Sequence, residues 1–183
     1  MDSNPLKSET IYQARVFRLC RETVTLPNGV TATLDVIHHP GSSAVVPLLP
    51  DGEVVMIRQY RHSLRQFLWE VPAGTLDPGE GFLECARREL IEETGYRAKH
   101  FEELTEILPA PGYSDERIRI FSASDLEPAP RKLDKDEVLE VAHLPLSETR
   151  AMIEDGRIQD AMTVIGLFLL CTRLHGGEFR AVL

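Results

Sequence analysis

The sequence predicts an α/β sandwich with a mixed β-sheet, and three observations indicate it. The chain has 183 residues, 43% of them hydrophobic, which is enough to bury one core of ordinary size. Several short segments have the Val- and Ile-rich or alternating pattern of strands, and others repeat apolar residues at helical spacing. Strands come first, then a helix, more strands and two helices, an order that favours helices packed on a sheet.

The N-terminal part is predicted to be an antiparallel strand region. Residues 9–37 form two strand segments around a tight turn at Asn28-Gly29, because an Asn-Gly pair is a strong hairpin signal. We therefore divide the chain into an N-terminal strand region, residues 1–40, and a main catalytic domain, residues 41–183.

Three more strands are predicted before the first helix. Residues 42–50 and 53–61 are rich in Val and Ile and flank an Asp51-Gly52 turn, so both are expected to be buried. A shorter strand ends at "WEVPAG", residues 69–74.

The helix over residues 81–94 is predicted from one apolar stripe. Its members recur at helical spacing, and a glycine follows as a stop signal: Leu83, Ala86 and Leu90, then Gly95. Later strands are predicted at residues 101–108, 118–124 and 137–146.

Two helices are predicted to end the chain. Ser147 is expected to cap a short helix that ends before Gly156. Asp160 is expected to cap a final helix that ends near Gly176-Gly177.

Composition excludes several classes of function. A net charge of -9 and a pI of about 5.2 argue against nucleic acid or an anionic membrane as the main partner. The three cysteines are widely spaced and form no CxxC pair, so we expect reduced thiols and a cytoplasmic protein. The start of the chain lacks the apolar stretch of a signal peptide. The longest apolar run, "VIGLFLLC", is far short of the roughly 20 residues that cross a bilayer.

Carboxylates are crowded on one face of the predicted helix. Glu89 and Glu93 are four residues apart and share a face, with Glu92 on its flank. A Gly- and Pro-rich loop, residues 72–81, precedes the helix and is suited to exposing backbone carbonyls. Carboxylates with a nearby carbonyl form the hard-oxygen site that Mg²⁺ prefers. The alternative is a solvated charged face with ordinary salt bridges.

This segment, "GTLDPGEGFLECARRELIEETGY", resembles the signature of the Nudix hydrolases. Eight of its positions stand in register with that signature, and only Tyr96 departs from it, at the final aliphatic place: Gly74, Glu80, Arg88, Glu89, Leu90, Glu92, Glu93 and Gly95. The resemblance implies an α/β/α sandwich around a mixed sheet. It also implies an enzyme in which water attacks a diphosphate that is linked to another group.

The same resemblance implies roles for residues in and beside the signature. It assigns the metal, Mg²⁺ with Mn²⁺ as the alternative, to four groups: Glu89, Glu92, Glu93 and the carbonyl of Ala73. It makes Arg88 the residue that orients the catalytic carboxylates, and Glu80 a tie between the loop and the helix.

Segments outside the signature are similar to the ADP-ribose pyrophosphatase subgroup. These are "MIRQYRHSL", "WEVPAG" and above all "PAPGYSDE", residues 109–116. They imply hydrolysis of ADP-ribose or a related nucleoside diphosphate sugar to a nucleoside monophosphate and a sugar phosphate. One alternative is broad hydrolysis of UDP-, GDP- and ADP-sugars, and another is a non-catalytic sensor that binds such a ligand.

Six residues are candidate substrate contacts under this resemblance: Tyr12, Arg58, Arg61, Glu70, Pro111 and Glu116. A guanidinium suits bidentate contact with a diphosphate, although both arginines could be ordinary strand-end charges. Tyr12 could stack on a base or cover the sheet. The two glutamates could contact substrate or support other groups.

The general base is expected in the segment "RKLDKDEVLEV", residues 131–141, where the resemblance selects Glu137. Asp134, Asp136 and Glu140 are the alternatives. The resemblance further implies a homodimer whose subunits exchange N-terminal strands. The other arrangement is an N-terminal hairpin folded onto its own subunit.

Overall fold

The computed structural model describes residues 5–133 and 135–174. The chain divides into two compact units. Unit 1 consists of the residues up to Gly41 together with Leu108–Arg117, and unit 2 of Ser42–Ile107 and the residues from Ile118 onward. Each unit is described by itself.

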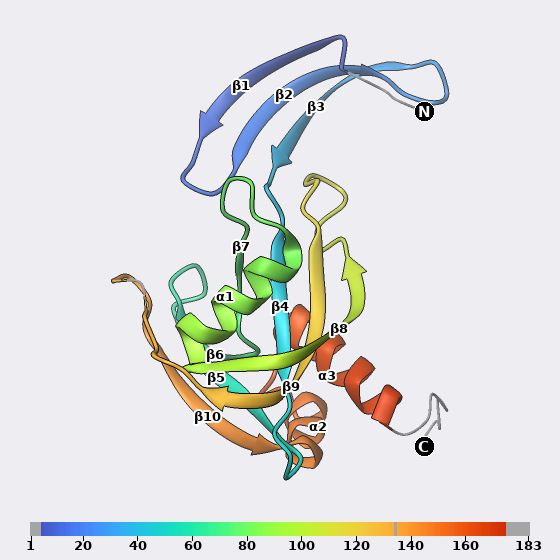
Figure 1. The fold of residues 1–183 in the computed structure, drawn as a ribbon. Helices are drawn as coiled ribbons and strands as arrows, with labels where there is room; N and C mark the ends of the chain where they lie inside the picture. The colour runs from blue at the N-terminus through green and yellow to red at the C-terminus, as the bar shows by residue number, and fades with distance from the viewer. Residues whose placement is uncertain (1–4, 134, 175–183) are drawn as a thin grey trace. The chain divides into compact units, whose positions relative to one another are not determined.

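Unit 1 contains a three-stranded antiparallel sheet in the order β1-β2-β3 (Figure 1). Its strands are β1 Lys7–Gln13, β2 Arg18–Thr25 and β3 Thr31–His38. The prediction of two strand segments here was wrong. The first splits at a turn closed by a hydrogen bond from Ala14 N to Phe17 O (2.9 Å), which apolar alternation does not indicate. The Asn28-Gly29 turn is confirmed, with Gly29 at φ 82° and Leu26 N donating to Val30 O.

The segment Leu108–Arg117 joins unit 1 by docking on β3. Ile37 N donates to Tyr113 O (2.8 Å), and Asp115 N donates to Ile37 O (3.1 Å). His38 strengthens this contact because its Nδ1 lies 2.6 Å from Asp115 Oδ2. A loop from the middle of the chain is therefore held by the N-terminal strands.

Unit 2 contains two sheets. The first is mixed, because β4 runs parallel to β9, and its order is β7 (Ala73–Thr75), β4 (Ser42–Pro47), β9 (Ile118–Pro128) and β8 (Tyr96–Ile107). The second is antiparallel, in the order β10 (Leu139–Pro145), β5 (Glu53–Arg61) and β6 (Gln66–Glu70). The Asp51-Gly52 turn before β5 is confirmed, with Gly52 at φ 87°.

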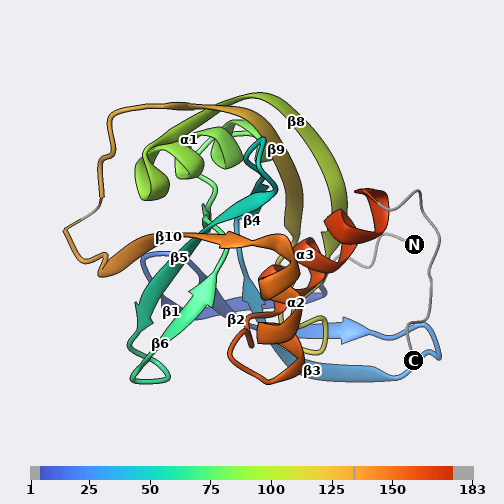
Figure 2. The same ribbon diagram turned by 90° about the horizontal axis from the view of Figure 1, so that it is seen from below.

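Helices cover both faces of the mixed sheet, as Figures 1 and 2 show for α1 (Phe82–Thr94) and α3 (Ala161–Leu174). Val45 packs with Leu90 of α1, whereas Ala44 and Val46 pack with Leu167 of α3 and with β5. Neighbouring residues of one buried strand thus serve two cores, which is why its apolar run is continuous. The predicted α/β/α sandwich is confirmed.

Two predicted strands differ from the structure in their boundaries. The strand expected at residues 101–108 is β8, which starts directly after the C-cap Gly95, at Tyr96. The strand expected to end with residues 69–74 is two strands, because the chain leaves β6 after Glu70. Val71 N donates there to Thr163 Oγ1 of α3 (2.9 Å).

Of the two predicted helix caps, Ser147 is wrong and Asp160 is confirmed. Ser147 is not the cap of α2 (Leu146–Glu154), because β10 runs to Pro145 and Pro145 occupies that position without a side-chain cap. Asp160 caps α3 as predicted, accepting hydrogen bonds from Thr163 N (2.9 Å) and Thr163 Oγ1 (2.7 Å). α3 is described to Leu174, and the expected end at Gly176-Gly177 lies outside the described residues.

Within the described residues, every helix is too short or too polar to cross a membrane.

Candidate functional site

Arg88 is the centre of a network that joins helix α1 to the loop before it. Its Nε and Nη2 each donate to the Glu80 carboxylate at 2.9 Å. Nη1 donates to Glu89 (2.6 Å) and Glu92 (3.1 Å), and Nη2 also reaches the carbonyl of Thr75 (3.1 Å). One guanidinium therefore fixes two helix carboxylates and the loop, which a planar fork of donors is suited to do.

Glu89 and Glu93 are buried carboxylates, with 7% and 1% of their surface exposed. Burial raises the pKa of Glu89 to about 7 and that of Glu93 well above its usual range. Glu93 Oε2 accepts one hydrogen bond from Ala73 N (2.8 Å). A solvated charged face, the alternative for this helix, is therefore wrong for these two residues.

Gly74 lets the loop approach the helix. A Cβ at this position would lie 1.8 Å from Glu89 Oε1, so any larger residue would displace the carboxylate. The carbonyl of Gly74 also lies 3.4 Å from Cys85 Sγ. The first glycine of the signature segment is thus explained by its close contact with the Glu89 carboxylate.

The donor set fits a divalent cation. Glu89, Glu92 and Glu93 offer hard oxygen atoms on α1, and Glu93 contacts the backbone of Ala73. A cation would offset the cost of burying two carboxylates. No group of three or more His, Cys, Asp or Glu side chains is already arranged as a metal cage in the described part of the chain. Arg88 instead occupies Glu89 and Glu92, so a bound ion would share these carboxylates with it.

We predict that the metal-free protein loses stability as the pH rises from about 4.5 to about 7. The pKa of Glu89 is higher in the folded chain, so folding binds a proton and is favoured at low pH. The expected loss is on the order of 3 kcal/mol. Melting curves in EDTA at pH 5 and pH 8 would measure it. In a Glu89→Gln variant the melting temperature should depend less on pH than in the wild type. The same pH dependence in both proteins would contradict the raised pKa of Glu89.

Arg61 and Glu70 form an ion pair between β5 and β6. Arg61 Nε donates to both oxygens of Glu70 (2.9 and 3.1 Å), and Nη2 lies 2.5 Å from Oε2. Glu70 is 1% exposed, and burial raises its pKa despite this partner. The positive charge of Arg61 offsets a small part of the rise in the pKa of Glu93, so Arg61 lies within electrostatic reach of Glu93.

Arg58 lies on the opposite face of β5 from Arg61, because the two are three residues apart on a strand. Its guanidinium stacks over Phe67 at 5.0 Å and lies 4.0 Å from Glu140. The structure therefore does not bring the two predicted diphosphate contacts together on one face of the strand.

The loop that carries Glu137 is anchored at the C-terminal end of α1. Arg131 Nε donates to Glu93 O (2.7 Å), and Lys132 N donates to Glu92 O (3.3 Å). These bonds satisfy carbonyls that a helix end leaves without partners. The charge of Glu137, a half-buried residue, raises the pKa of Glu89 and Glu93, so Glu137 lies within electrostatic reach of both.

The other candidates for the base are placed differently. Asp136 and Glu140 are exposed, and Glu140 lies beside Arg58. Asp134 lies outside the described residues.

Three predicted substrate contacts lie in unit 1. Tyr12 is 60% exposed on β1, Pro111 is exposed, and the Glu116 carboxylate lies 3.5 Å from His39 Nδ1. A neighbouring cluster, in which His38 lies between Asp115 (2.6 Å) and Glu22 (3.1 Å), was not predicted from the sequence. The three residues are far apart along the chain, and only Asp115 belongs to a segment that the sequence singled out, "PAPGYSDE".

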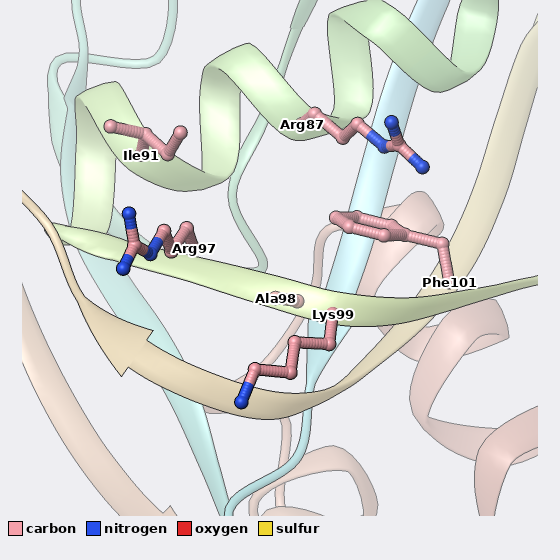
Figure 3. Close-up of a pocket in the computed structure, with 6 residues that line it drawn as sticks. All are labelled: Arg87, Ile91, Arg97, Ala98, Lys99 and Phe101. Atoms are coloured by element: carbon pink, nitrogen blue, oxygen red, sulfur yellow. The ribbon is translucent and has the colours of Figure 1, made fainter.

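A cavity of about 240 Å³ lies between α1 and β8 (Figure 3). Its α1 residues, Arg87 and Ile91, are two positions before Glu89 and Glu93 and therefore face the other side of the helix. Arg87 stacks over Phe101 at 5.4 Å there, and Glu127 neutralises Arg97 and Lys99. None of the predicted site residues lines this cavity.

The chain is similar to known proteins over most of its length. A relative in Bacillus methanolicus, a methanol dehydrogenase activator, is 37% identical over 168 residues, which cover 91% of each chain. The ADP-ribose pyrophosphatase of Bacillus subtilis (strain 168) is 34% identical over 169 residues, again 91% of each chain. The crystal structure of an ADP compounds hydrolase superposes with a TM-score of 0.81 at 28% identity, and covers 97% of this chain and 98% of its own.

The family model described as the NUDIX domain matches residues 38–162. That range contains α1, the loop before it and the segment that carries Glu137. Enzymes of this family generally act with a divalent metal ion, which the donor set on α1 fits. This protein is an enzyme of the NUDIX family.

Proposed function

We propose that the protein hydrolyses the diphosphate bond of ADP-ribose, or of a related nucleoside diphosphate sugar, with Mg²⁺. The observation that carries this is the pair of buried carboxylates, Glu89 and Glu93, held beside Arg88 within the matched signature. The substrate class is supported by relatives whose names refer to ADP-ribose and ADP compounds. The products are a nucleoside monophosphate and a sugar phosphate.

The metal ligands in this proposal are Glu89, Glu92, Glu93 and the carbonyl of Ala73. Mg²⁺ is preferred and Mn²⁺ is the alternative, because all four groups present hard oxygen atoms. When bound, the ion neutralises the diphosphate and lowers the pKa of water beside it. Arg88 keeps the carboxylates in place through its bonds to Glu80 and the loop.

Glu137 is the proposed general base. Its carboxylate accepts a proton from the attacking water while the water oxygen bonds to one phosphorus atom. The bond from that phosphorus to the bridging oxygen breaks, and the bridging oxygen leaves with the other phosphate. The electrostatic reach of Glu137 to Glu89 and Glu93 supports this role.

The proposed substrate contacts follow from residue chemistry. Arg61, oriented by Glu70, lies within electrostatic reach of Glu93 and is suited to the diphosphate. Arg58 lies on the other face of β5, so we do not assign it to the same diphosphate. Tyr12, Pro111 and Glu116 remain the proposed contacts for the base or sugar.

We further propose a homodimer with exchanged N-terminal strands. Every residue of β1 is exposed, and unit 1 exposes large apolar side chains: Leu6, Ile11, Tyr12, Val30 and Leu34. Exposed apolar surface on a strand region is suited to pairing with a second copy. Light scattering should give twice the mass of one chain, and the mass of a monomer at micromolar concentration would contradict the dimer.

The cytoplasm is the proposed location. The three cysteines are free, and the net charge of -9 disfavours nucleic acid or an anionic membrane as a partner. Recovery of the protein in a membrane fraction after cell lysis would contradict this location.

We predict that kcat/KM is highest for ADP-ribose among ADP-ribose, ADP-glucose, GDP-mannose and UDP-glucose. A site that hydrogen-bonds one base and sugar should disfavour the others by at least about 10-fold. Phosphate release after phosphatase treatment, with Mg²⁺ present, measures all four. Equal values would favour the broad nucleoside diphosphate sugar hydrolase. Binding of ADP-ribose without turnover of any substrate would favour the sensor and overturn the enzyme proposal.

A further inference from the structure

Gln59 is a buried polar residue of β5 to which the proposed mechanism gives no role. Only 7% of its surface is exposed. Its side-chain carbonyl oxygen has no hydrogen-bond partner among the residues that the structure describes. An unpaired buried acceptor destabilises a fold, so native proteins keep one mainly where water, an ion or a ligand uses it.

The strand register places Gln59 on the face of β5 opposite to that of Val54 and Met56, which pack in the core with Leu167 of α3. Side chains alternate along a strand, so Ile57, Gln59 and Arg61 share one face. Across the sheet, Ile57 is opposite Glu70, the partner of Arg61. Gln59 therefore lies between Ile57, which is buried, and Arg61, which is paired with Glu70.

Strand β10 gives a second, independent marker of this face. Leu139 is directly opposite Gln59. His143 is on the same face of β10, opposite Val55. His143 Nε2 is hydrogen-bonded to the hydroxyl of Tyr96, the residue after the α1 cap (3.2 Å). Glu137 precedes Leu139 by two residues. The proposed base is therefore next to the end of β10 that pairs with Gln59.

The neighbouring donors that the structure describes make no bond to the Gln59 carbonyl oxygen. Arg61 donates to Glu70 through Nε and Nη2, and Ala73 N donates to Glu93. The remaining groups on this side, Glu89 and Glu137 among them, are acceptors when ionised. The phosphate oxygens at the cleaved bond are also acceptors at neutral pH. Water is the reactant at that bond that brings O–H donors.

We propose that Gln59 is a positioning residue whose side-chain carbonyl oxygen accepts a hydrogen bond from the attacking water. This inference rests on the proposed diphosphate hydrolysis and deepens it. One hydrogen stays on the water oxygen and is donated as a hydrogen bond to Gln59, and the other passes as a proton to Glu137 while the oxygen bonds to phosphorus. Two acceptors thereby fix the direction of the oxygen lone pair.

The test replaces Gln59 by methionine, which keeps similar volume and removes the acceptor. The metal-free variant should melt about 2–4 °C higher, because an unpaired buried acceptor is gone. Its kcat for ADP-ribose with Mg²⁺ should fall by about 10–100-fold with KM nearly unchanged. The same change at the exposed Gln159 should alter neither the melting temperature nor kcat.

The combination of a higher melting temperature and a lower kcat separates a positioning role from a packing role, which would lower both. Unchanged kcat in Gln59→Met, with an active wild type, overturns this inference and leaves the proposed function intact. A rise in KM alone assigns Gln59 to a substrate hydroxyl and also overturns it. A wild type that cleaves no diphosphate overturns both. Gln59→Leu repeats the test if the methionine variant does not fold.

Discussion

Replacing Glu89 by glutamine is expected to reduce kcat for ADP-ribose by about 10³-fold while leaving the protein folded. Glutamine keeps the shape of the side chain but removes one negative charge from the proposed Mg²⁺ site, which supplies several kcal/mol to the reaction. Glu89 is buried with a raised pKa, so the neutral variant should also melt higher than wild type in EDTA at pH 8. Steady-state kinetics and melting curves check the two halves of this prediction.

Glu84→Gln is the matched control for this variant. Glu84 is on the same helix but is exposed, so the same substitution there should change kcat little. Titration with Mn²⁺, followed by its paramagnetic effect on water relaxation, should show weaker binding only in Glu89→Gln. A native turnover rate in Glu89→Gln would remove Glu89 from the metal site.

Replacing Arg88 by methionine is expected to destabilise the protein by about 3 kcal/mol at pH 8, or roughly 6–12 °C in Tm. The substitution keeps an unbranched side chain but removes the charge that lies between Glu80 and Glu89. The ion pair with Glu92 contributes less to stability, because the Glu92 side chain is one third exposed and solvent screens the pair. The remaining carboxylates would then repel one another across the loop and helix.

The loss in Arg88→Met should shrink as the pH falls. Arg88 lowers the pKa of Glu80 in the folded protein, so its contribution is present above the unfolded pKa and is lost as the pH falls through the folded value. Arg87→Met is the matched control, because Arg87 is the next residue but points to the other side of α1 (Figure 3). Equal destabilisation of both variants, or a loss that grows at low pH, would contradict the role of Arg88.

Much of unit 2 could be predicted because its signals are local. The alternation and apolar runs of β4 and β5, the stripe on α1 and the cap Asp160 each act within a few residues. The errors occurred where a contact distant in sequence decided the outcome. Thr163 of α3 holds Val71 between β6 and β7, and no property of the segment at residues 69–74 shows that.

The candidate site was predicted in part. The signature fixed the identity and spacing of the α1 carboxylates, and hence the chemistry that they can support. It did not show that Glu89 and Glu93 are buried, that Arg61 is already paired with Glu70, or that Gln59 faces the same side. Burial and pairing depend on what packs against each residue, which lies elsewhere in the chain.

The sequence by itself determined the family, the α/β/α class and the crowding of carboxylates on one helix, because these follow from residue type and periodicity. Only the tertiary structure decided how that crowding is accommodated. Arg88 bridges Glu80 to the helix, Gly74 admits Glu89 against the backbone, and burial raises the pKa of the two inner glutamates. Like charges on a helix weaken it in water, but here a guanidinium bridges the carboxylates and a close backbone packs against them, so the fold accommodates the crowding.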